Sequence, residues 1–507
     1  MVTEHSIFAA VDLGSNSFKL QTARVVDNQI YPLDSLREPV CLASGLTADK
    51  KLDEPSQARA LACLKRFAER LRGLPPQAVR AVGTNTLRVA KNGLAFLKQA
   101  EAALGFPIEV VAGREEARLI YLGVAQSLPA ISERRLVVDI GGGSTEFIIG
   151  SGIRPQKLES LYMGCVSYSL RFFPEGKISK SNLKEAELAA RNELQIIVSE
   201  FSAGHWQEAV GSSGTVKALS DILELNGYSE SGITAGGLEK FRSYLLKAGN
   251  VDRLAIEGLK TDRAPVIAGG FAIMSAVFSE LGIEHMKLAS GALRQGLLFD
   301  LLGRIHHKDM REATVQQFME RYNVDSAQAK SVETLAQDLL RQLAKETDFP
   351  EDAARLVSWS SRLHEIGISV AHSGYHKHSA YIIQNADMLG FSKMEQGRVS
   401  LLVLAHRGKL SKVRNLLTDE SQWSQILALR LAALFCRSRR APSLQRIQVK
   451  TISSGFSVSL DKEWLKRNPL TVMALLEETK EWKSVGLELE VSFLKELENQ
   501  PDFIVAQ

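Results

Sequence analysis

Two short loops combine glycine with hydroxyl side chains, and each follows an aspartate at the end of an apolar run. The first loop covers residues 12–17 (DLGSNS) and the second covers residues 139–146 (DIGGGSTE). Because glycine lacks a Cβ atom, the backbone N–H groups of such a loop can converge on an anion, and hydroxyl groups add further donors. A Gly-Gly hairpin turn is the alternative explanation for the second loop. The flanking carboxylates and hydroxyls favour a phosphate site.

The second loop carries more of the predicted chemistry than the first. Asp139 and Glu146 flank its three glycines, and two such carboxylates can hold a hydrated Mg²⁺ or orient water. The first loop lacks the extra glycines and the second carboxylate, so we expect it to close the site from the opposite side. The predicted phosphate ligands in the two loops are Asn16, Ser17, Gly141, Gly142, Gly143, Ser144 and Thr145.

A third small-residue loop, residues 211–215 (GSSGT), follows a predicted strand and opens a helix. Free N–H groups at a helix N-terminus attract phosphate, so Gly214 and Thr215 are candidate ligands. A simple helix cap explains the loop equally well. The corresponding segment earlier in the chain, residues 83–88 (GTNTLR), ends in Arg88, whose guanidinium could bind phosphate oxygens in a bidentate way.

Two adjacent carboxylates, Glu115 and Glu116, stand at the predicted start of a helix after Gly113. Acidic residues are common in the first turn of a helix because they interact favourably with its dipole. One of the two could instead orient an attacking water in a cleft. The residues alone leave this choice open.

The elements that must position these loops alternate between strands and helices over the first three hundred residues, which indicates an α/β fold. The predicted strands are residues 7–12, 18–26, 79–82 and 108–111, and the predicted helices are residues 56–71, 94–104 and 115–125. The loop motifs also repeat. The aspartates of the two phosphate loops are 127 residues apart, and residues 81–84 (AVGT) match residues 209–212 (AVGS) at an offset of 128. We therefore predict two related α/β domains.

The rest of the chain has a different pattern. Residues 310–440 have helical periodicity, for example over 327–343 and 353–363, with few strand signals. Residues 446–452 and 456–460 predict a hairpin, Asp461 is a candidate N-cap for a helix through Leu476, and residues 487–493 predict a last strand. The predicted domains are residues 1–124, 125–303, 304–441 and 442–507.

Composition excludes several classes of protein. The net charge of +4 is too small to argue for nucleic-acid binding, and the four cysteines are widely spaced, as expected for buried thiols in a reducing compartment. Residues 1–8 do not resemble a secretory signal, and apolar stretches such as residues 264–274 are shorter than a membrane span. We expect a soluble, cytoplasmic protein without a membrane span or nucleic-acid partner.

The chain resembles the exopolyphosphatase and guanosine pentaphosphate phosphohydrolase family along almost its whole length, and most of all a bacterial exopolyphosphatase. The matching stretches are VDLGSNSF, GTNTLR, GREEARLIYLGV, DIGGGSTE, MGCVS, GSSGT, GALRQG, LHEIGI and HSGYHKHSAYIIQN. The resemblance implies a duplicated ribonuclease-H-like fold, shared with actin, a class of heat-shock chaperones and sugar kinases. It also implies release of orthophosphate from the end of polyphosphate, with Mg²⁺ as cofactor and K⁺ as an activator. We further expect a homodimer.

Carried over to this sequence, the resemblance assigns the family's essential helix glutamate to Glu116. Asp139 and Glu146 match its loop carboxylates, Ser144 its loop hydroxyl and Arg88 its substrate arginine. We therefore expect Glu116 to orient or deprotonate the water. Mg²⁺ at Asp139 and Glu146 would then stabilise charge on the phosphoryl group together with Arg88 and the loop amides.

The helical region resembles a metal-dependent HD phosphohydrolase domain but departs from its motif, because His364-Glu365 stands where a His-Asp ligand pair is expected. His372, His376, His378 and His406 are further candidate ligands. We expect no catalytic metal here. The basic residues are expected either to guide a polyanion or to form solvated helix ends, and they are Lys377, Arg398, Arg407, Lys409, Arg437, Arg439 and Arg440.

The leading prediction is a Mg²⁺-dependent exopolyphosphatase that works processively, with polyphosphate threaded between the N-terminal cleft and the C-terminal domains. Hydrolysis of the 5′ γ-phosphate of guanosine pentaphosphate at the same site is the near alternative. A different class is an actin-like ATP switch, for which Gly269-Gly270 before a helix could be a remnant of a nucleoside pocket. A sugar kinase would need an acceptor pocket, and the sequence carries no mark of one.

Overall fold

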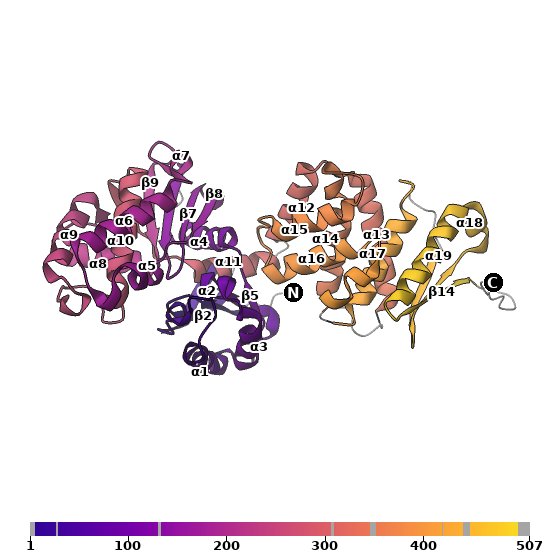
Figure 1. Ribbon diagram of the computed structural model, residues 1–507, viewed down its shortest axis with the longest axis horizontal. Coiled ribbons are helices and arrows are strands. Elements are labelled where there is room, and N and C mark those ends of the chain that lie inside the picture. Colours follow the sequence, from indigo (N-terminus) through magenta and orange to yellow (C-terminus); the bar gives the residue numbers. More distant parts are fainter. Residues whose placement is uncertain are drawn as a thin grey trace. The chain divides into compact units, whose positions relative to one another are not determined.

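The computed structural model describes residues 6–26, 29–129, 133–305, 309–344, 351–417, 419–439 and 447–494. The chain forms two compact units, residues 1–309 and 310–507, and each is described here by itself (Figure 1). The first unit therefore contains both of the predicted α/β domains. Helix α4 (Gly113–Ser127) runs across the boundary that the sequence predicted between them.

The first unit contains two sheets. When the second is read from β8, its first five strands correspond in order to the five strands of the first sheet, and β10 is an additional edge strand. In the first sheet the order is β3-β2-β1-β4-β5, and in the second it is β10-β11-β9-β6-β7-β8. The strands of the first sheet are β1 (Ser6–Leu13), β2 (Phe18–Val26), β3 (Gln29–Glu38), β4 (Val79–Gly83) and β5 (Ile108–Val110). Those of the second are β6 (Arg135–Ile140), β7 (Thr145–Ser151), β8 (Arg154–Leu161), β9 (Glu208–Ser212), β10 (Ile233–Thr234) and β11 (His285–Leu288).

The connections confirm the duplication. In both sheets an antiparallel meander of three strands is followed by a parallel strand beside the first, because β1 pairs with β2 and β4 as β6 pairs with β7 and β9. The predicted phosphate loops are the β1–β2 and β6–β7 hairpins, and the GTNTLR and GSSGT segments follow β4 and β9. All four segments therefore leave the same edge of their sheets, which is where ligands bind in open α/β sheets.

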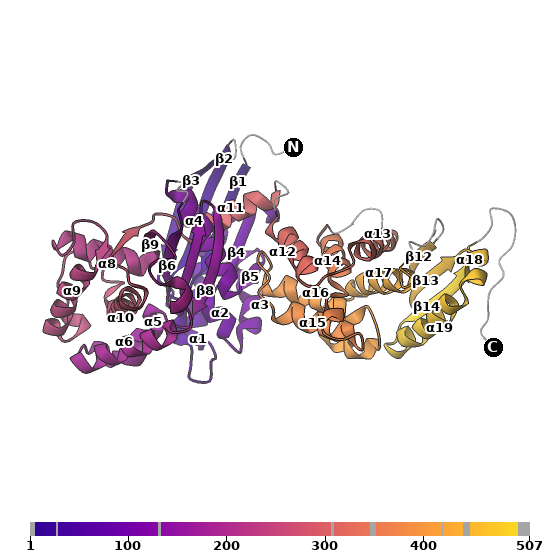
Figure 2. The same cartoon turned by 90° about the horizontal axis from the view of Figure 1, so that it is seen from above.

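Two helices hold the sheets together. Helix α4 packs on α11 (Leu293–Ile305), and both are labelled in Figure 2. The core around them takes side chains from both sheets. The helices approach closely because glycines lie at their contact. A Cβ atom on Gly296 would stand 1.8 Å from the carbonyl oxygen of Leu119. This packing fixes the start of α4, and with it Glu115 and Glu116, relative to the loops of both sheets.

The outer faces of the sheets are covered by further helices. Helices α1 (Glu54–Leu71) and α3 (Gly93–Leu104) cover the first sheet, and the second carries α5 (Cys165–Phe172), α6 (Lys180–Leu194), α8 (Ser213–Leu225), α9 (Ala235–Ala248) and α10 (Ala264–Leu281). Among the described residues, α10 is the one helix long and apolar enough to cross a membrane by length and composition, and 72% of it is buried inside the protein. Its apolar stretch is longer than expected from the sequence.

Gly269 and Gly270 lie inside α10, so the expected glycine turn before a helix is wrong. A Cβ atom on Gly269 would stand 2.6 Å from the backbone of α5, and one on Gly270 would stand 2.4 Å from the side chain of Thr215. Both glycines serve close packing of α10.

The second unit is helical at its start and ends in a three-stranded sheet. Its helices are α12 (Met310–Arg321), α13 (Ser326–Leu343), α14 (Glu351–Leu363), α15 (Tyr375–Asn385), α16 (Lys393–Ala405), α17 (Gln422–Phe435), α18 (Lys462–Arg467) and α19 (Pro469–Ser484). The strands β12 (Ile447–Ile452), β13 (Gly455–Leu460) and β14 (Glu488–Phe493) pair in that order. A single apolar core runs through the helices and the sheet, so the predicted last two domains share one interior.

The predicted hairpin and last strand are present, although Arg446, at its expected start, lies outside the described residues. Asp461 caps a helix as predicted, but that helix ends at Arg467, and α19 starts at Pro469. Proline lacks an N–H and disfavours helical backbone in the residue before it, and Asn468 indeed has the non-helical angles φ −128° and ψ 58°. The prediction of one helix through Leu476 is therefore wrong.

Candidate active site

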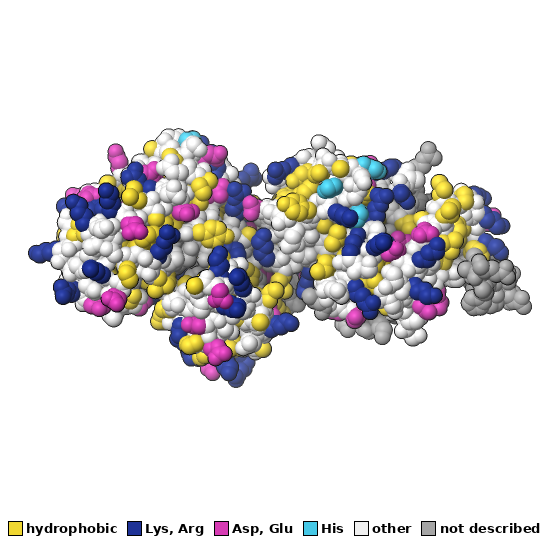
Figure 3. All heavy atoms as spheres, viewed as in Figure 1, with side chains coloured by type: hydrophobic (Ala, Val, Ile, Leu, Met, Phe, Trp, Pro, Cys, Tyr) yellow, Lys and Arg dark blue, Asp and Glu magenta, His cyan; other side chains and the backbone are white. Residues whose placement is uncertain are grey.

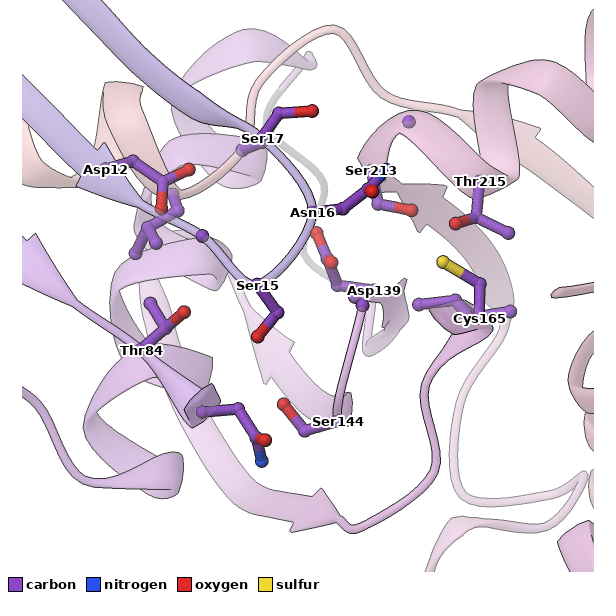
Figure 4. Close-up of a pocket in the computed structure, with 18 of the residues that line it drawn as sticks. Asp12, Ser15, Asn16, Ser17, Thr84, Asp139, Ser144, Cys165, Ser213 and Thr215 are labelled. Carbon is purple, nitrogen blue, oxygen red and sulfur yellow. The ribbon is translucent and has the colours of Figure 1, made fainter. Parts of the chain in front are cut away.

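A cavity of about 90 Å³ lies between the two predicted phosphate loops in the first unit. Figure 4 shows hydroxyl and amide side chains from both sheets around it, with Asp139 among them. Among the predicted site residues, its walls include Asn16, Ser17, Glu116, Asp139, Gly141, Gly142, Ser144, Gly214 and Thr215. Residues from every predicted phosphate segment therefore meet at one place.

The two loops touch because the second has no side chain at the contact. A Cβ atom on Gly142 would stand 2.9 Å from the Cβ atom of Ser15 and 3.2 Å from the backbone nitrogen of Asn16. The amides of Cys165 and Val166, at the start of α5, donate to the carbonyl oxygens of Gly141 and Gly142 at 2.9 and 3.0 Å. Helix α5 thus supports the glycine loop from behind.

The two hairpins differ in charge at one position, where the first has Lys19 and the second has Glu146. Asp12 faces Lys19 across β1 and β2, and the two side chains form an ion pair at 3.6 Å. Asp139 faces Glu146 in the same way across β6 and β7. Like charges directly opposite each other destabilise a strand pair. The second hairpin therefore concentrates negative charge where the first neutralises it.

Both acids of the second hairpin are buried and held by serines. Ser212 donates a hydrogen bond to Asp139, and Ser160 donates to Glu146 at 2.8 Å. Burial raises the pKa of Asp139, and burial together with the nearby charges of Glu116 and Asp139 raises the pKa of Glu146 well above its usual value. A bound cation would offset both effects.

Asp139 and Glu146 are suitable ligands for a magnesium ion whose other ligands are waters and phosphate oxygens. Within the described parts of the chain no group of three or more His, Cys, Asp or Glu side chains could hold a metal by itself. Mg²⁺ needs no such group, because it commonly binds one or two carboxylates, waters and substrate phosphates. One further oxygen, Oδ1 of Asp12, is buried without a hydrogen bond among the described residues. This donor set is compatible with Mg²⁺ between the loops.

The neighbouring carboxylates Glu115 and Glu116 have different partners. Glu116 lines the cavity and pairs with Arg88 of α2 (Asn85–Val89) at 3.0 Å, while Arg88 also donates to the carbonyl oxygen of Val111 at 2.9 Å. Burial raises the pKa of Glu116 to about 7, although Arg88 opposes the shift. Glu115 instead accepts two hydrogen bonds of 2.8 Å from Arg118. Glu116 is thus the member of the pair that faces the cavity.

Two predicted ligands are used in other ways. Thr145 is completely buried, and its hydroxyl donates to the carbonyl oxygen of Met163 at 2.6 Å. Gly143 packs against Asn85, since a Cβ atom there would stand 2.4 Å from Oδ1 of Asn85. Neither residue contributes to the walls of the cavity. Glu146 and Arg88 do not line the cavity either, but each lies next to a residue that does, Glu146 beside Gly141 and Arg88 in an ion pair with Glu116.

The structure adds residues that the sequence did not identify. Arg263, one residue before α10, lines the cavity and is 9% exposed, and its side chain has no hydrogen bond or ion pair among the described residues. Its guanidinium lies over Gly214, where a Cβ atom would stand 2.1 Å from Nη2. Asn85 also lines the cavity, and its buried Nδ2 has no partner in the described chain. A lone arginine before an apolar helix carries no sequence signal that reveals such a position.

Ser213 is the strained residue of the site. It lines the cavity with φ 91°, a conformation that side chains other than glycine rarely adopt. Such strain persists only where the surroundings enforce it, and it gathers at ligand sites. Here it occurs at the start of α8, beside the predicted ligands Gly214 and Thr215.

The histidines of the second unit form no metal site among the residues that the structure describes. The rings of His364 and His406 lie 5.2 Å apart, and in each the Nδ1 atom faces a carbonyl oxygen at 2.6 Å, so this nitrogen carries the proton. Glu365 accepts two hydrogen bonds from Arg439, at 2.7 and 2.9 Å. Arg439 is therefore occupied by a carboxylate, and Arg440 lies outside the described residues.

The duplicated fold and the converging phosphate loops define an enzyme that acts on phosphate groups. The chain belongs to the Ppx/GppA phosphatase family, because the family model matches residues 22–305 and the model of domain III of the same family matches residues 310–479. The resemblance noted in the sequence is thereby confirmed, and the protein is a hydrolase of the phosphatase kind.

Solved structures have a similar fold over part of this chain. An exopolyphosphatase from Cytophaga hutchinsonii is 23% identical with a TM-score of 0.54, and the match covers 59% of this chain and 98% of that one. An exopolyphosphatase-like protein is 22% identical with a TM-score of 0.55, over 60% of this chain and 100% of its own. A Ppx/GppA family member from Aquifex aeolicus is 25% identical with a TM-score of 0.49, over 60% and 100% of the two chains.

Proposed function

We propose that the protein is an exopolyphosphatase that removes terminal phosphates from inorganic polyphosphate. The size of the cavity is the observation that carries this proposal. At about 90 Å³ it is far smaller than the 300–1,000 Å³ typical of pockets for drug-sized ligands. Such a space suits a phosphoryl group better than a nucleoside, and this disfavours the actin-like ATP switch.

Each of the charged side chains in and beside the cavity has a proposed role in hydrolysis. Glu116, with its raised pKa, would accept the proton of the attacking water. Arg88, Arg263 and the loop amides would stabilise negative charge as the phosphoryl group is transferred. Mg²⁺ bound at Asp139 and Glu146 would supply additional positive charge on the phosphate oxygens.

Three features of the proposal stay predictions from the sequence. These are stimulation by K⁺, a homodimeric state and processive action on long chains. Cytoplasmic location likewise stays a prediction. Figure 3 shows acidic and basic side chains interspersed over the visible face, which agrees with the small net charge of +4.

A comparison of substrates tests the proposal. The purified full-length chain is incubated with long-chain polyphosphate, guanosine pentaphosphate or ATP, each with Mg²⁺, and orthophosphate release is measured as kcat/KM. We expect the largest value for polyphosphate. A larger value for guanosine pentaphosphate, confirmed by competition between the two, would replace the proposal with the near alternative. Hydrolysis of ATP alone would refute both.

A further inference from the structure

We propose that Arg37 is a substrate-phosphate ligand of this site, which Asp262 holds away from the cavity in the free enzyme and releases when phosphate enters. The proposal rests on the proposed function, since it describes how a phosphate chain is bound beyond the reacting group. It assigns opposite roles to the two members of one ion pair, and this makes it testable.

The sheet register places Arg37 on the same row as the first phosphate loop. Arg37 on β3 pairs with Lys19 on β2, which in turn pairs with Asp12 on β1. Side chains that face each other across neighbouring strands lie on one side of the sheet. The equivalent row of the second sheet is Asp139, Glu146 and Ser160. Arg37 therefore has the place in the first sheet that Ser160, which donates a hydrogen bond to Glu146, has in the second.

Arg37 reaches across to the other half of the unit. Its Nη2 lies 2.6 Å from Oδ2 of Asp262, which precedes α10 and is 225 residues away in the chain. The same nitrogen lies 3.4 Å from Oγ of Ser17, a residue of the cavity wall. Both side chains of the pair are partly exposed, at 36% and 32%. A small rotation of Arg37 about its flexible stem would exchange Asp262 for an anion at Ser17.

Arg263, the residue next to Asp262, has no carboxylate paired with its guanidinium among the described residues. Arg263 is more than nine-tenths buried in the cavity wall, and its guanidinium has no hydrogen bond or ion pair in the described chain. Burial lowers its pKa, and so does the positive charge of Arg37. Two guanidinium groups from opposite halves thus repel each other beside an open cavity. A phosphate between them would satisfy both, and it would be a second phosphate next to the one at Asp139.

Energetic magnitudes favour the exchange. A partly exposed ion pair such as Arg37–Asp262 changes an equilibrium by about fivefold at most. Contacts between arginine and phosphate are charge-assisted and often bidentate, and removing one such contact changes binding by about tenfold or more. Phosphate therefore displaces the carboxylate. Asp262 then acts as a competitor that weakens the binding of every substrate.

Opposite effects of two substitutions test the proposal. Binding of tripolyphosphate to the full-length protein is measured by calorimetry, and KM and kcat are measured with long-chain polyphosphate. We expect Arg37→Gln to weaken binding and raise KM about tenfold with kcat unchanged. Asp262→Asn should tighten binding about threefold to fivefold. In the double variant, Asp262→Asn should have no effect, because the arginine that it frees is absent.

A purely structural ion pair gives a different pattern. Both single variants would then weaken binding alike, and that result would overturn the proposal, as would the absence of any change in Arg37→Gln. The matched control is Arg66→Gln, which removes an exposed arginine paired with Glu38 on the same strand β3 and should leave binding unchanged.

The calorimetric arm separates this proposal from the proposed function. If the wild-type protein does not hydrolyse polyphosphate while the opposite effects on tripolyphosphate binding are present, the proposed function fails and the phosphate subsite stands. If hydrolysis is present and the opposite effects are absent, the subsite alone fails.

Discussion

Glu115 and Glu116 are adjacent in the chain, yet their surroundings give them different properties. Glu115 is locked in a buried ionic network with Arg118, which also pairs with Asp300 of α11. Glu116 has a single arginine partner and a face open to the cavity. Glu116 is also one member of a buried ion pair, but its raised pKa means that its charge opposes folding on balance, so a neutral amide at this position leaves the fold intact. Removing the charge of Glu115 instead leaves Arg118 without the carboxylate that accepts two of its hydrogen bonds. The two substitutions should therefore fail in different ways.

We expect Glu116→Gln to lower kcat by about 10²- to 10⁴-fold with little change in KM, because it removes the group that takes the proton from water. Glu115→Gln should instead cost about 3–5 kcal/mol of unfolding free energy, because it leaves Arg118 without its bidentate partner. Steady-state kinetics and denaturant unfolding of both variants separate the effects. Full activity of Glu116→Gln would mean that another group activates the water.

The carboxyl cluster predicts a cost to stability in the absence of metal. Burial raises the pKa of Glu116 to about 7, and the pKa values of Asp139 and Glu146 are raised too. An acid whose pKa is higher in the folded than in the unfolded protein opposes folding wherever it must ionise. The cost is absent below about pH 4.5, the unfolded value, and is complete above the folded value.

We therefore expect the EDTA-treated protein to melt at a lower temperature at pH 8 than Glu116→Gln does, by the equivalent of about 1–3 kcal/mol, and to be restored by Mg²⁺. The difference between variant and wild type should vanish near pH 4.5. Glu69→Gln, which removes an exposed carboxylate on α1, serves as the control. A variant no more stable than wild type at pH 8 would show that Glu116 carries no such cost.

At the scale of elements, the helices of the second unit gather three buried histidines around positive charges. Burial lowers the pKa of His376 to about 4, helped by Lys412, Arg407, Lys377 and Arg430, and burial also lowers the pKa of His364 and of His406. A histidine whose folded pKa is depressed stabilises the fold fully above its unfolded pKa, near 6.5. This contribution is lost as the pH falls below that value.

We expect the second unit to lose on the order of 1–3 kcal/mol between pH 7 and pH 5.5, and His406→Asn to reduce this loss. Tryptophan fluorescence during denaturant unfolding is a suitable probe, because four of the five tryptophans lie after residue 309. The exposed His285 of the first unit gives the control, since His285→Gln should leave the slope with pH unchanged. An equal loss in His406→Asn would point to other groups.

The sequence predicted elements with a buried face better than elements without one. Strands β1, β2 and β4 were found because their apolar residues are inside, whereas β3 was not, since it is exposed along most of its length and has no alternation to detect. Asp461 predicts the start of α18 but not its end, which depends on Pro469 at the start of α19. The glycines of α10 were misread because close helix packing and a turn demand the same residue.

The candidate site was predictable to a similar extent. Loops that contain consecutive glycines, hydroxyls and acids have a local signal, and the structure brings them together. Arg263 and Arg37 have none, because their importance comes from what the fold places opposite them. Thr145 is the opposite case, because it has the motif but its hydroxyl donates to the carbonyl oxygen of Met163 and not to the cavity.

At the scale of the molecule, these solved structures match only part of this chain. The Cytophaga hutchinsonii and exopolyphosphatase-like structures match 59% and 60% of it along nearly their whole lengths. Among the described residues, the second unit has its own core, whose first member is Val315.

We expect residues 1–309, produced alone, to fold cooperatively and to release phosphate from tripolyphosphate at a rate close to that of the full chain, because the whole cavity lies within them. Processive degradation of long chains should be lost if the second unit guides them. Gel analysis of the products distinguishes the two modes, since a distributive enzyme leaves intermediate lengths. Undiminished processivity would confine the property to the first unit.

The pairing of Asp12 with Lys19 and of Asp139 with Glu146 bears on how a duplicated enzyme becomes asymmetric. Two identical halves would present the same charge on both sides of the cleft and would compete for one metal. Once the halves are joined in a single chain, each copy can change independently. A difference at one register position, lysine in one copy and glutamate in the other, is enough to make one side of the cleft more negative than the other. An extended polyanion that enters the cleft would then be bound in one orientation.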